Sequence, residues 1–200
     1  MKKPSVYKKE QIIEAAFELL RGKGWDMVTA RAIAKRLGSS TMPIYSHVRS
    51  VDELILPIRD RAKKLLKKYQ QYPYTEYVLL NLAFGYVTFA RDEKNLFRFL
   101  YLEKPHLLLE EDKVAMTDFF IEEFGEGSAE VKELFALESG GLEKFLQYNW
   151  IFTHGLAMLV NAGTFKKTTD EAIISYLKNA GAAFFLQVKQ NEEVEKDVEK

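Results

Sequence analysis

Eight side chains between Ser40 and Arg49 carry groups that can bind a nucleic acid. They are three hydroxyls, a thioether, a pyrrolidine, a phenol, an imidazole and a guanidinium, supplied by Ser40, Thr41, Met42, Pro43, Tyr45, Ser46, His47 and Arg49. Polar groups of these kinds can bond to phosphate oxygens or base edges, whereas a methionine can only make apolar contact. Ile44 and Val48 form the apolar stripe of the same segment. The pattern indicates a short helix that a DNA major groove could accept.

The preceding residues would position that helix. Apolar residues recur at helical spacing between Ile33 and Leu37, and Gly38 is expected to end this helix in the left-handed conformation. Ser40 is expected to cap the next helix, and Pro43 falls in its first turn, where the missing N–H costs no hydrogen bond. The sequence therefore predicts two helices joined by a glycine turn.

These residues resemble the DNA-binding domain of the TetR family of transcriptional regulators. The family pattern has Thr-x-x-x-Ile-Ala-x-x-x-Gly in the second helix, Leu-Tyr-x-His-Phe at the end of the third and Ser-Lys-x-x-Leu at the start of the fourth. The matching residues here are Thr29, Ile33, Ala34 and Gly38, then residues 44–48, then residues 50–54. The resemblance covers about a quarter of the chain and implies a three-helix helix-turn-helix head.

Individual DNA contacts follow from the residue types and from the resemblance. Thr41 and Met42 are expected to reach base edges, while Tyr45 and His47, by resemblance, bind phosphate. Val51 stands where the family usually has a phosphate-binding lysine, so that contact is expected to be lost or to move to Arg49. The complete set of predicted DNA-binding residues is Thr29, Arg31, Ser40, Thr41, Met42, Pro43, Tyr45, His47 and Arg49.

The composition fits a folded protein. Hydrophobic residues make up 47% of the 200 residues and aromatic residues 13%, which argues against disorder. The absence of cysteine excludes disulfides and thiolate zinc sites. The basic N-terminus lacks an apolar signal core, and no apolar run approaches the ~20 residues needed to cross a bilayer. We therefore expect a cytoplasmic, soluble protein with no membrane partner.

The formal net charge of zero conceals an asymmetry. Residues 1–70 contain 16 Lys and Arg against 7 Asp and Glu, a net charge of +9, which leaves −9 for residues 71–200. A basic N-terminal part would be attracted to the phosphate backbone, and an acidic remainder would be repelled by it. The asymmetry favours a polyanion as partner.

Helical spacing of apolar residues continues along the whole chain, so the predicted fold class is all-α. The predicted helices are Lys8–Gly22, Ser50–Tyr69, Thr75–Arg91, Glu93–Glu103, Leu107–Phe124, Ser128–Leu137, Leu142–Ala162 and Thr169–Lys189. Ser50 with Glu53, and Thr168 with Glu171, are expected to form capping boxes. Pro57 is expected to kink its helix, and the pair Gly140-Gly141 to separate two helices.

Three segments are expected. They are a helix-turn-helix DNA-binding domain at 1–49, a helical effector-binding and dimerisation domain at 50–190 and a charged tail at 191–200. Small residues at 180–183 would let another helix approach closely. The resemblance implies a homodimer through a four-helix bundle, which suits a reader of palindromic double-stranded DNA. Packing within one chain is the alternative.

Residues Trp150, His154 and Gly155 resemble the Trp-x-x-x-His-Gly signature of one TetR subgroup. His154 could bond to a small effector while Trp150 stacks on it; alternatively, both side chains belong to the core. Aromatic residues could line an apolar cavity with a few polar anchors. The predicted ligand-binding residues are Phe89, Phe119, Asn149, Trp150 and His154, and the predicted effector is apolar or aromatic.

An enzyme is the weaker interpretation. Glu103-x-x-His106 has the spacing of half a di-iron site, but Pro105 interrupts it and no second copy exists. No phosphate-binding loop or nucleophile elbow is present. We expect no catalytic residue, metal or cofactor. The predicted function is a repressor released from its operator by a small ligand; the alternative is a helical effector-binding or protein-interaction module with a vestigial head.

Overall fold

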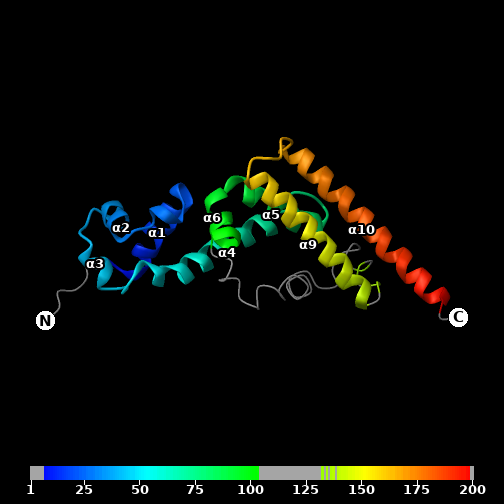
Figure 1. The fold of residues 1–200 in the computed structure, drawn as a ribbon, viewed down its shortest axis with the longest axis horizontal. Coiled ribbons are helices and arrows are strands. Elements are labelled where there is room, and N and C mark those ends of the chain that lie inside the picture. The colour runs from blue at the N-terminus through cyan, green and yellow to red at the C-terminus, as the bar shows by residue number, and fades with distance from the viewer. Residues whose placement is uncertain (1–6, 104–131, 133, 135, 138, 199–200) are drawn as a thin grey trace. The chain divides into compact units, whose positions relative to one another are not determined.

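The computed structural model describes residues 7–103, 132, 134, 136, 137 and 139–198 (Figure 1). Its elements are α1 (Lys9–Lys23), η1 (Trp25–Met27), α2 (Ala30–Leu37), α3 (Met42–Tyr45), η2 (Val51–Leu54), α4 (Ile55–Gln71), α5 (Val78–Asp92), α6 (Lys94–Arg98), η3 (Phe99–Glu103), α9 (Ser139–Asn161) and α10 (Asp170–Val198). The described residues contain no strand, which confirms the predicted all-α fold. None of their helices is long and apolar enough to cross a membrane. The helices predicted at 107–124 and 128–137 lie wholly or mainly outside these residues.

The described residues form two compact units. The N-terminal unit contains residues 7–67 and 92–103, and the C-terminal unit contains residues 68–91 and the described residues from 132 onward. Within residues 7–103 the chain passes from one unit to the other within α4 and returns at the end of α5.

The N-terminal unit has one apolar core. Its fully buried side chains include Ile12, Ala16, Leu20, Ile33, Ile44, Leu54 and Ile58. The first three follow one another at four-residue spacing on α1, so a single stripe of that helix faces the core. Removing such a stripe from water contributes several kcal/mol, at about 25 cal/mol per Å² of apolar surface.

Residues 92–103 join this core although they follow α1 by about seventy positions in the chain. The guanidinium of Arg21 holds the carboxylate of Glu93 through two nitrogens, with Nε to Oε2 at 2.7 Å. Asn95 Nδ2 donates to the Arg21 carbonyl at 2.9 Å. Trp25 packs on Phe99 with ring centroids 5.2 Å apart. These contacts fix α6 and η3 against the end of α1.

The start of α4 differs from the prediction. Residues 51–54 form a 3-10 turn, and the α-helix begins at Ile55. The side chain of Ser50 makes no cap hydrogen bond, and the Glu53 carboxylate accepts from the Arg49 N–H at 3.2 Å instead. Pro57 is therefore the third residue of α4, where no intrahelical donor is required, so the physical basis for the predicted kink is removed.

The C-terminal unit contains the long helices α9 and α10, which run side by side in opposite directions (Figure 1). The break predicted at Gly140-Gly141 lies a few residues earlier: residues 136 and 137 form a turn and a bend, and α9 begins at Ser139, so both glycines belong to its first turn. Gly141 lies against α10: a Cβ there would come within 3.1 Å of Val188 Cγ1. The glycine thus permits a close helix contact. The associated apolar cluster comprises Leu134, Leu137, Leu142, Phe145, Leu146 and Val188.

The start of α10 is capped one residue later than predicted. Thr169 Oγ1 accepts from the Ala172 N–H at 3.3 Å, so Thr169 replaces Thr168 as the cap. Arg91 Nη1 bonds to the Thr168 carbonyl at 3.0 Å and to Asp170 Oδ1 at 2.6 Å, which joins α5 to the start of α10. At its other end α10 continues to Val198, into the charged segment that begins at residue 191.

Gly85 lets α5 approach the last turn of α4. A Cβ at this position would overlap the backbone carbonyl of Tyr69, which cannot rotate away as a side chain could. We expect Gly85→Ala to lower the free energy of unfolding by about 1–3 kcal/mol, the range for overpacked sites. Urea titration followed by circular dichroism measures the change.

Gly22→Ala is the matched control, since Gly22 also lies in a helix but a Cβ there meets no atom within 4 Å. This variant should be neutral or more stable, because alanine favours helix. Equal stability of the two variants would contradict the close approach at Gly85.

Candidate functional site

The predicted recognition helix is the single turn α3, and its neighbours determine its position. Gly38 adopts the left-handed conformation (φ 66°, ψ 32°), as predicted, and ends α2. Thr41, not Ser40, precedes α3 as its cap residue, and no side-chain cap bond forms. Ile44 is fully buried, and it anchors the turn in the core of the N-terminal unit.

The opposite side of α3 is exposed. Met42 is 79% exposed and Tyr45 56% exposed, large values for an apolar and an aromatic side chain. Thr41 and Pro43 are half-buried beside them, and Ser40 is exposed. The structure therefore brings five of the predicted DNA-binding side chains to one short stretch of surface, with a hydroxyl, a thioether and a phenol adjacent.

Tyr7 joins the ends of α2 and α3, a role that the sequence reasoning missed. Its hydroxyl donates to the Leu37 carbonyl at 2.6 Å, one of the carbonyls that a helix end leaves without an intrahelical partner. Its own carbonyl lies 2.7 Å from His47 Nε2. Because a carbonyl only accepts, His47 must carry a hydrogen on Nε2. The half-buried His47 ring is thus engaged in holding the head together.

The remaining predicted DNA-binding residues lie before and after α3 in the chain, at the start of α2 and at Arg49. Thr29 Oγ1 accepts from the Ala32 N–H at 3.1 Å and caps α2, which leaves its own hydrogen available to donate. Arg31 and Arg49 are exposed, and no ion pair engages either guanidinium within the described residues.

The other arginines of residues 7–67 differ from these two. Arg21, Arg36, Arg59 and Arg61 are paired with Glu93, Glu18, Asp60 and Glu14, respectively. Within this part of the chain, Arg31 and Arg49 are therefore the arginines whose charge is not already neutralised by a carboxylate.

The predicted ligand-binding residues lie in two different surroundings. Trp150 and His154 pack on Tyr86: its ring centroid is 5.2 Å from that of Trp150, and its hydroxyl is 2.9 Å from His154 Nδ1. Phe89 is fully buried against Tyr69, with ring centroids 5.5 Å apart. Phe119 lies outside the described residues.

Asn149 lines a cavity of about 330 Å³ within the C-terminal unit. The lining residues come from α5 and the residue before it, from α9 and α10, and from Leu134. They are Tyr77, Leu79, Leu80, Ala83, Leu134, Phe145, Asn149, Leu177, Lys178, Gly181, Ala182 and Phe185. Trp150, His154 and Phe89 are not among them. The cavity has the size and mostly apolar character of a small-molecule site.

Burial lowers the pKa of His154 below its usual value of 6.5. The neutral ring can accept the Tyr86 hydrogen bond at Nδ1, whereas a proton on Nδ1 would remove that acceptor. No group of three or more His, Asp or Glu side chains in the described residues is arranged to hold a metal ion. His106, with its Glu103-x-x-His106 spacing, lies outside those residues.

The part of the chain that matches known proteins includes α2 and α3. Residues 12–58 match the family of bacterial regulatory proteins called tetR. A stretch of 60 residues, 30% of this chain, is 36% identical to an uncharacterized HTH-type transcriptional regulator of Mycobacterium tuberculosis. That stretch spans 28% of the length of the relative.

The lowered pKa of His154 predicts how stability depends on pH. In the unfolded chain the imidazole takes up a proton as pH falls through 6.5, but the folded state does so only at lower pH. The free energy of unfolding should therefore decrease as pH falls below 6.5 and stop decreasing below the folded pKa. Urea midpoints measured from pH 8 to pH 5 test this expectation.

His154→Gln keeps a polar side chain and removes the titration. Its unfolding midpoint should depend less on pH over this window than that of the unmodified protein, although it should be lower at pH 8. Parallel pH profiles for the two proteins would show that His154 is not responsible.

Proposed function

We propose that this protein, which belongs to the TetR family through its N-terminal domain, is a DNA-binding transcriptional regulator. It acts in the cytoplasm as a homodimer on a palindromic operator, and most simply as a repressor that a small effector releases. We assign DNA binding to residues 1–49, effector binding and dimerisation to 50–190 and the tail to 191–200; these functional segments differ from the compact N-terminal unit, which continues to residue 67 and includes residues 92–103.

The observation that carries this proposal is the exposed face of α3. Burying Met42 and Tyr45 would normally be favourable in a folded protein, so their exposure suggests a surface that is covered by a partner. Arg31 on α2 and Arg49 after α3, whose guanidinium groups have no carboxylate partner within the described residues, can bond to phosphates. The hydroxyls of Thr29 and Ser40 can donate to further phosphate oxygens.

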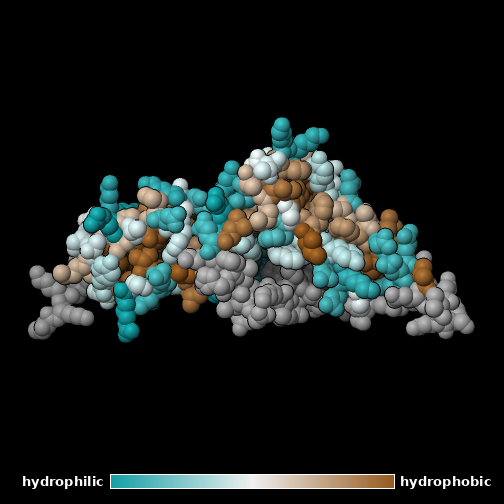
Figure 2. All heavy atoms as spheres, viewed as in Figure 1, coloured by the Kyte–Doolittle hydropathy of each residue, from teal (hydrophilic) through white to brown (hydrophobic). Residues whose placement is uncertain are grey.

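Dimerisation is supported by the exposed surface of α9 and α10, over which hydrophobic side chains gather in Figure 2. Ile151 is 61% exposed and Leu159 49% on α9; Leu186 is 59% exposed on α10. Gly155 lies between the first two on the same side of α9, and a Cβ there would meet nothing within 4 Å. A second copy could cover these residues in a four-helix bundle. Two heads would then meet half-sites roughly 34–36 Å apart.

Effector control is supported by the cavity that Asn149 lines. A ligand that binds one dimer geometry more tightly than another must change DNA affinity by that difference. We assign Trp150, His154 and Phe89 a supporting role: they hold α5 against α9 and α4, and so fix the helices that carry the lining residues.

Selection of bound duplexes from a random pool tests DNA recognition. We expect Thr41→Ala and Met42→Ala each to change the preferred base at one step by ~1–3 kcal/mol. Tyr45→Phe removes a phosphate contact and should weaken binding to all sequences equally. Arg49→Ala should reduce the slope of log affinity against log salt by about one without changing sequence preference.

Arg36→Ala is the control for Arg49→Ala, since Arg36 is already paired with Glu18 of α1. Its salt slope should match that of the unmodified protein. If Tyr45→Phe relaxed base preference while Thr41→Ala and Met42→Ala did not, Tyr45 would be the base contact and the other two would not. Failure of the unmodified protein to select any sequence would favour an effector-binding module with a vestigial head.

Ile151→Glu tests the dimer. Ile151 is exposed in the single chain, so the fold should tolerate the change, but a carboxylate in a dimer interface would lose its hydration. Sedimentation should therefore show dimers for the unmodified protein at micromolar concentration and monomers for this variant. Lys166→Glu, at an exposed loop position between α9 and α10, should remain dimeric. A monomeric unmodified protein would exclude this interface.

A further inference from the structure

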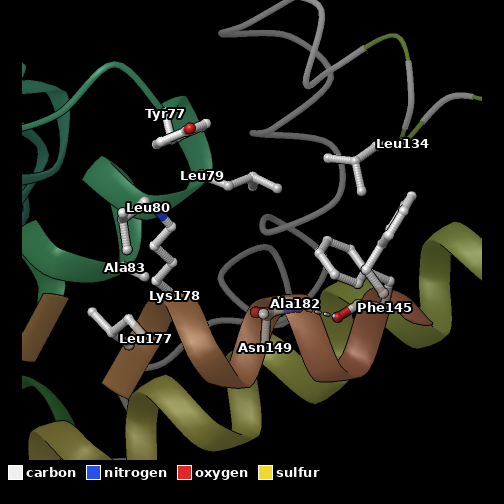
Figure 3. Close-up of a pocket in the computed structure, with 12 residues that line it drawn as sticks. Tyr77, Leu79, Leu80, Ala83, Leu134, Phe145, Asn149, Leu177, Lys178 and Ala182 are labelled. Carbon is white, nitrogen blue, oxygen red and sulfur yellow. Dashed lines mark hydrogen bonds between the residues drawn. The ribbon is translucent and has the colours of Figure 1, made fainter. Parts of the chain in front are cut away.

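The cavity lined by Asn149 has chemically different ends (Figure 3). Apolar side chains make up most of its wall, with Phe145 and Leu134 on one side. Phe185 packs on Phe145, with ring centroids 6.0 Å apart. Tyr77 and Lys178 lie together on the other side, near Leu80. An occupant that matches this wall needs an apolar body and a polar group at one end only.

Lys178 gives the polar end a positive charge. Its Nζ lies 5.2 Å from the centre of the Tyr77 ring, a cation–π contact that holds the ammonium group beside the cavity. Among the described residues, no carboxylate pairs with Lys178 and no Asp or Glu lines the cavity. An ammonium has three N–H donors, so it can bind an anion while it remains on the ring.

Asn149 adds an acceptor oxygen to the cavity wall. Its Nδ2 donates to the Phe145 carbonyl at 2.8 Å, which fixes the orientation of the amide and leaves Oδ1 as an acceptor. Oδ1 faces Gly181, where a Cβ would lie 3.4 Å from it. An acceptor oxygen disfavours a neighbouring carboxylate, so the floor of the cavity directs the charged group towards Lys178.

We infer that the cavity binds an amphipathic organic carboxylate, with its carboxylate on Lys178 and its apolar body between α5 and the two phenylalanines. Lys178 is exposed, so the charged group stays partly hydrated and the cost of desolvation is small. A volume of about 330 Å³ lies at the lower end of the range for ligand sites and favours a small molecule. This inference rests on the proposed function, since it names the class of effector.

Calorimetry on the full chain with matched probes tests the inference. Octanoate and 3-phenylpropionate supply the carboxylate on an aliphatic and an aromatic body; 1-octanol and 3-phenylpropan-1-ol are the uncharged counterparts. At least one carboxylate should bind more tightly than its alcohol. Lys178→Gln should weaken binding of that carboxylate about tenfold, the size of one charge-assisted bond, and leave the alcohol unchanged.

Two further variants complete the test. Lys166→Gln removes an exposed lysine that does not line the cavity, and it should bind all four probes as the unmodified protein does. Ala182→Leu fills part of the cavity and should weaken carboxylates and alcohols alike. Tighter binding of the alcohols, or equal carboxylate binding with and without Lys178, would overturn the inference.

Operator affinity in the presence of each probe separates this inference from the proposed function. Carboxylate binding that depends on Lys178 but leaves DNA affinity unchanged would support the ligand class and contradict effector control. Release from DNA by the alcohols alone, with no effect of Lys178→Gln, would support effector control and contradict the ligand class.

Discussion

The pairing of Arg21 with Glu93 is the constraint on which the N-terminal unit depends. Glu93 is only 6% exposed, and a carboxylate so far removed from water is tolerated when a cation and hydrogen bonds compensate it. Arg21 supplies both through a two-nitrogen contact. The ion pair therefore holds residues 92–103, which are distant in sequence, against the end of α1. Without it, α6 would have few polar contacts to distinguish one position along α1 from another.

A second arginine lies two residues before Glu93. Arg91 is bonded to Thr168 and Asp170 in the C-terminal unit, while Glu93 is bonded to Arg21 in the N-terminal unit. The chain passes from one unit to the other between these two anchors. Each unit thus holds its own end of the crossing by an ion pair, and only Asp92 stands between the two anchored residues.

Local patterns in the sequence predicted features whose causes are also local. The left-handed turn at Gly38 and the buried stripe that contains Ile44 follow from residues within a few positions, and both are confirmed. The capping boxes fail for a competing local reason: Glu53 finds the Arg49 N–H, and Thr169 caps in place of Thr168. The glycine pair at 140–141 lies in the first turn of α9 and not in the predicted break; Gly141 allows the approach of Val188, which lies almost fifty residues away and leaves no local signal.

The candidate sites show the same limit. The exposed side of α3 could be predicted from the sequence. The Tyr7 contacts depend on distant groups, and so does the lack of a carboxylate partner for Arg31 and Arg49 among the described residues. The polar end of the cavity is formed by Lys178 and Tyr77, which are about a hundred residues apart in the chain. The spacing of apolar residues along the sequence does not predict this contact. The sequence offers one indication of the cavity's polar end: Lys178 lies one turn before Gly181 on a helix that is otherwise rich in small and apolar residues.

The short length of α3 has a consequence for the portability of DNA recognition. One turn of helix has too few internal hydrogen bonds to persist alone. Its shape is imposed by Ile44 beneath it and by Tyr7, which ties Leu37 and His47 from outside the motif. Under the proposed function, sequence preference would therefore be a collective property of the head. Grafting residues 41–45 onto a related scaffold should transfer their side chains without their orientation, unless the tyrosine and histidine move with them.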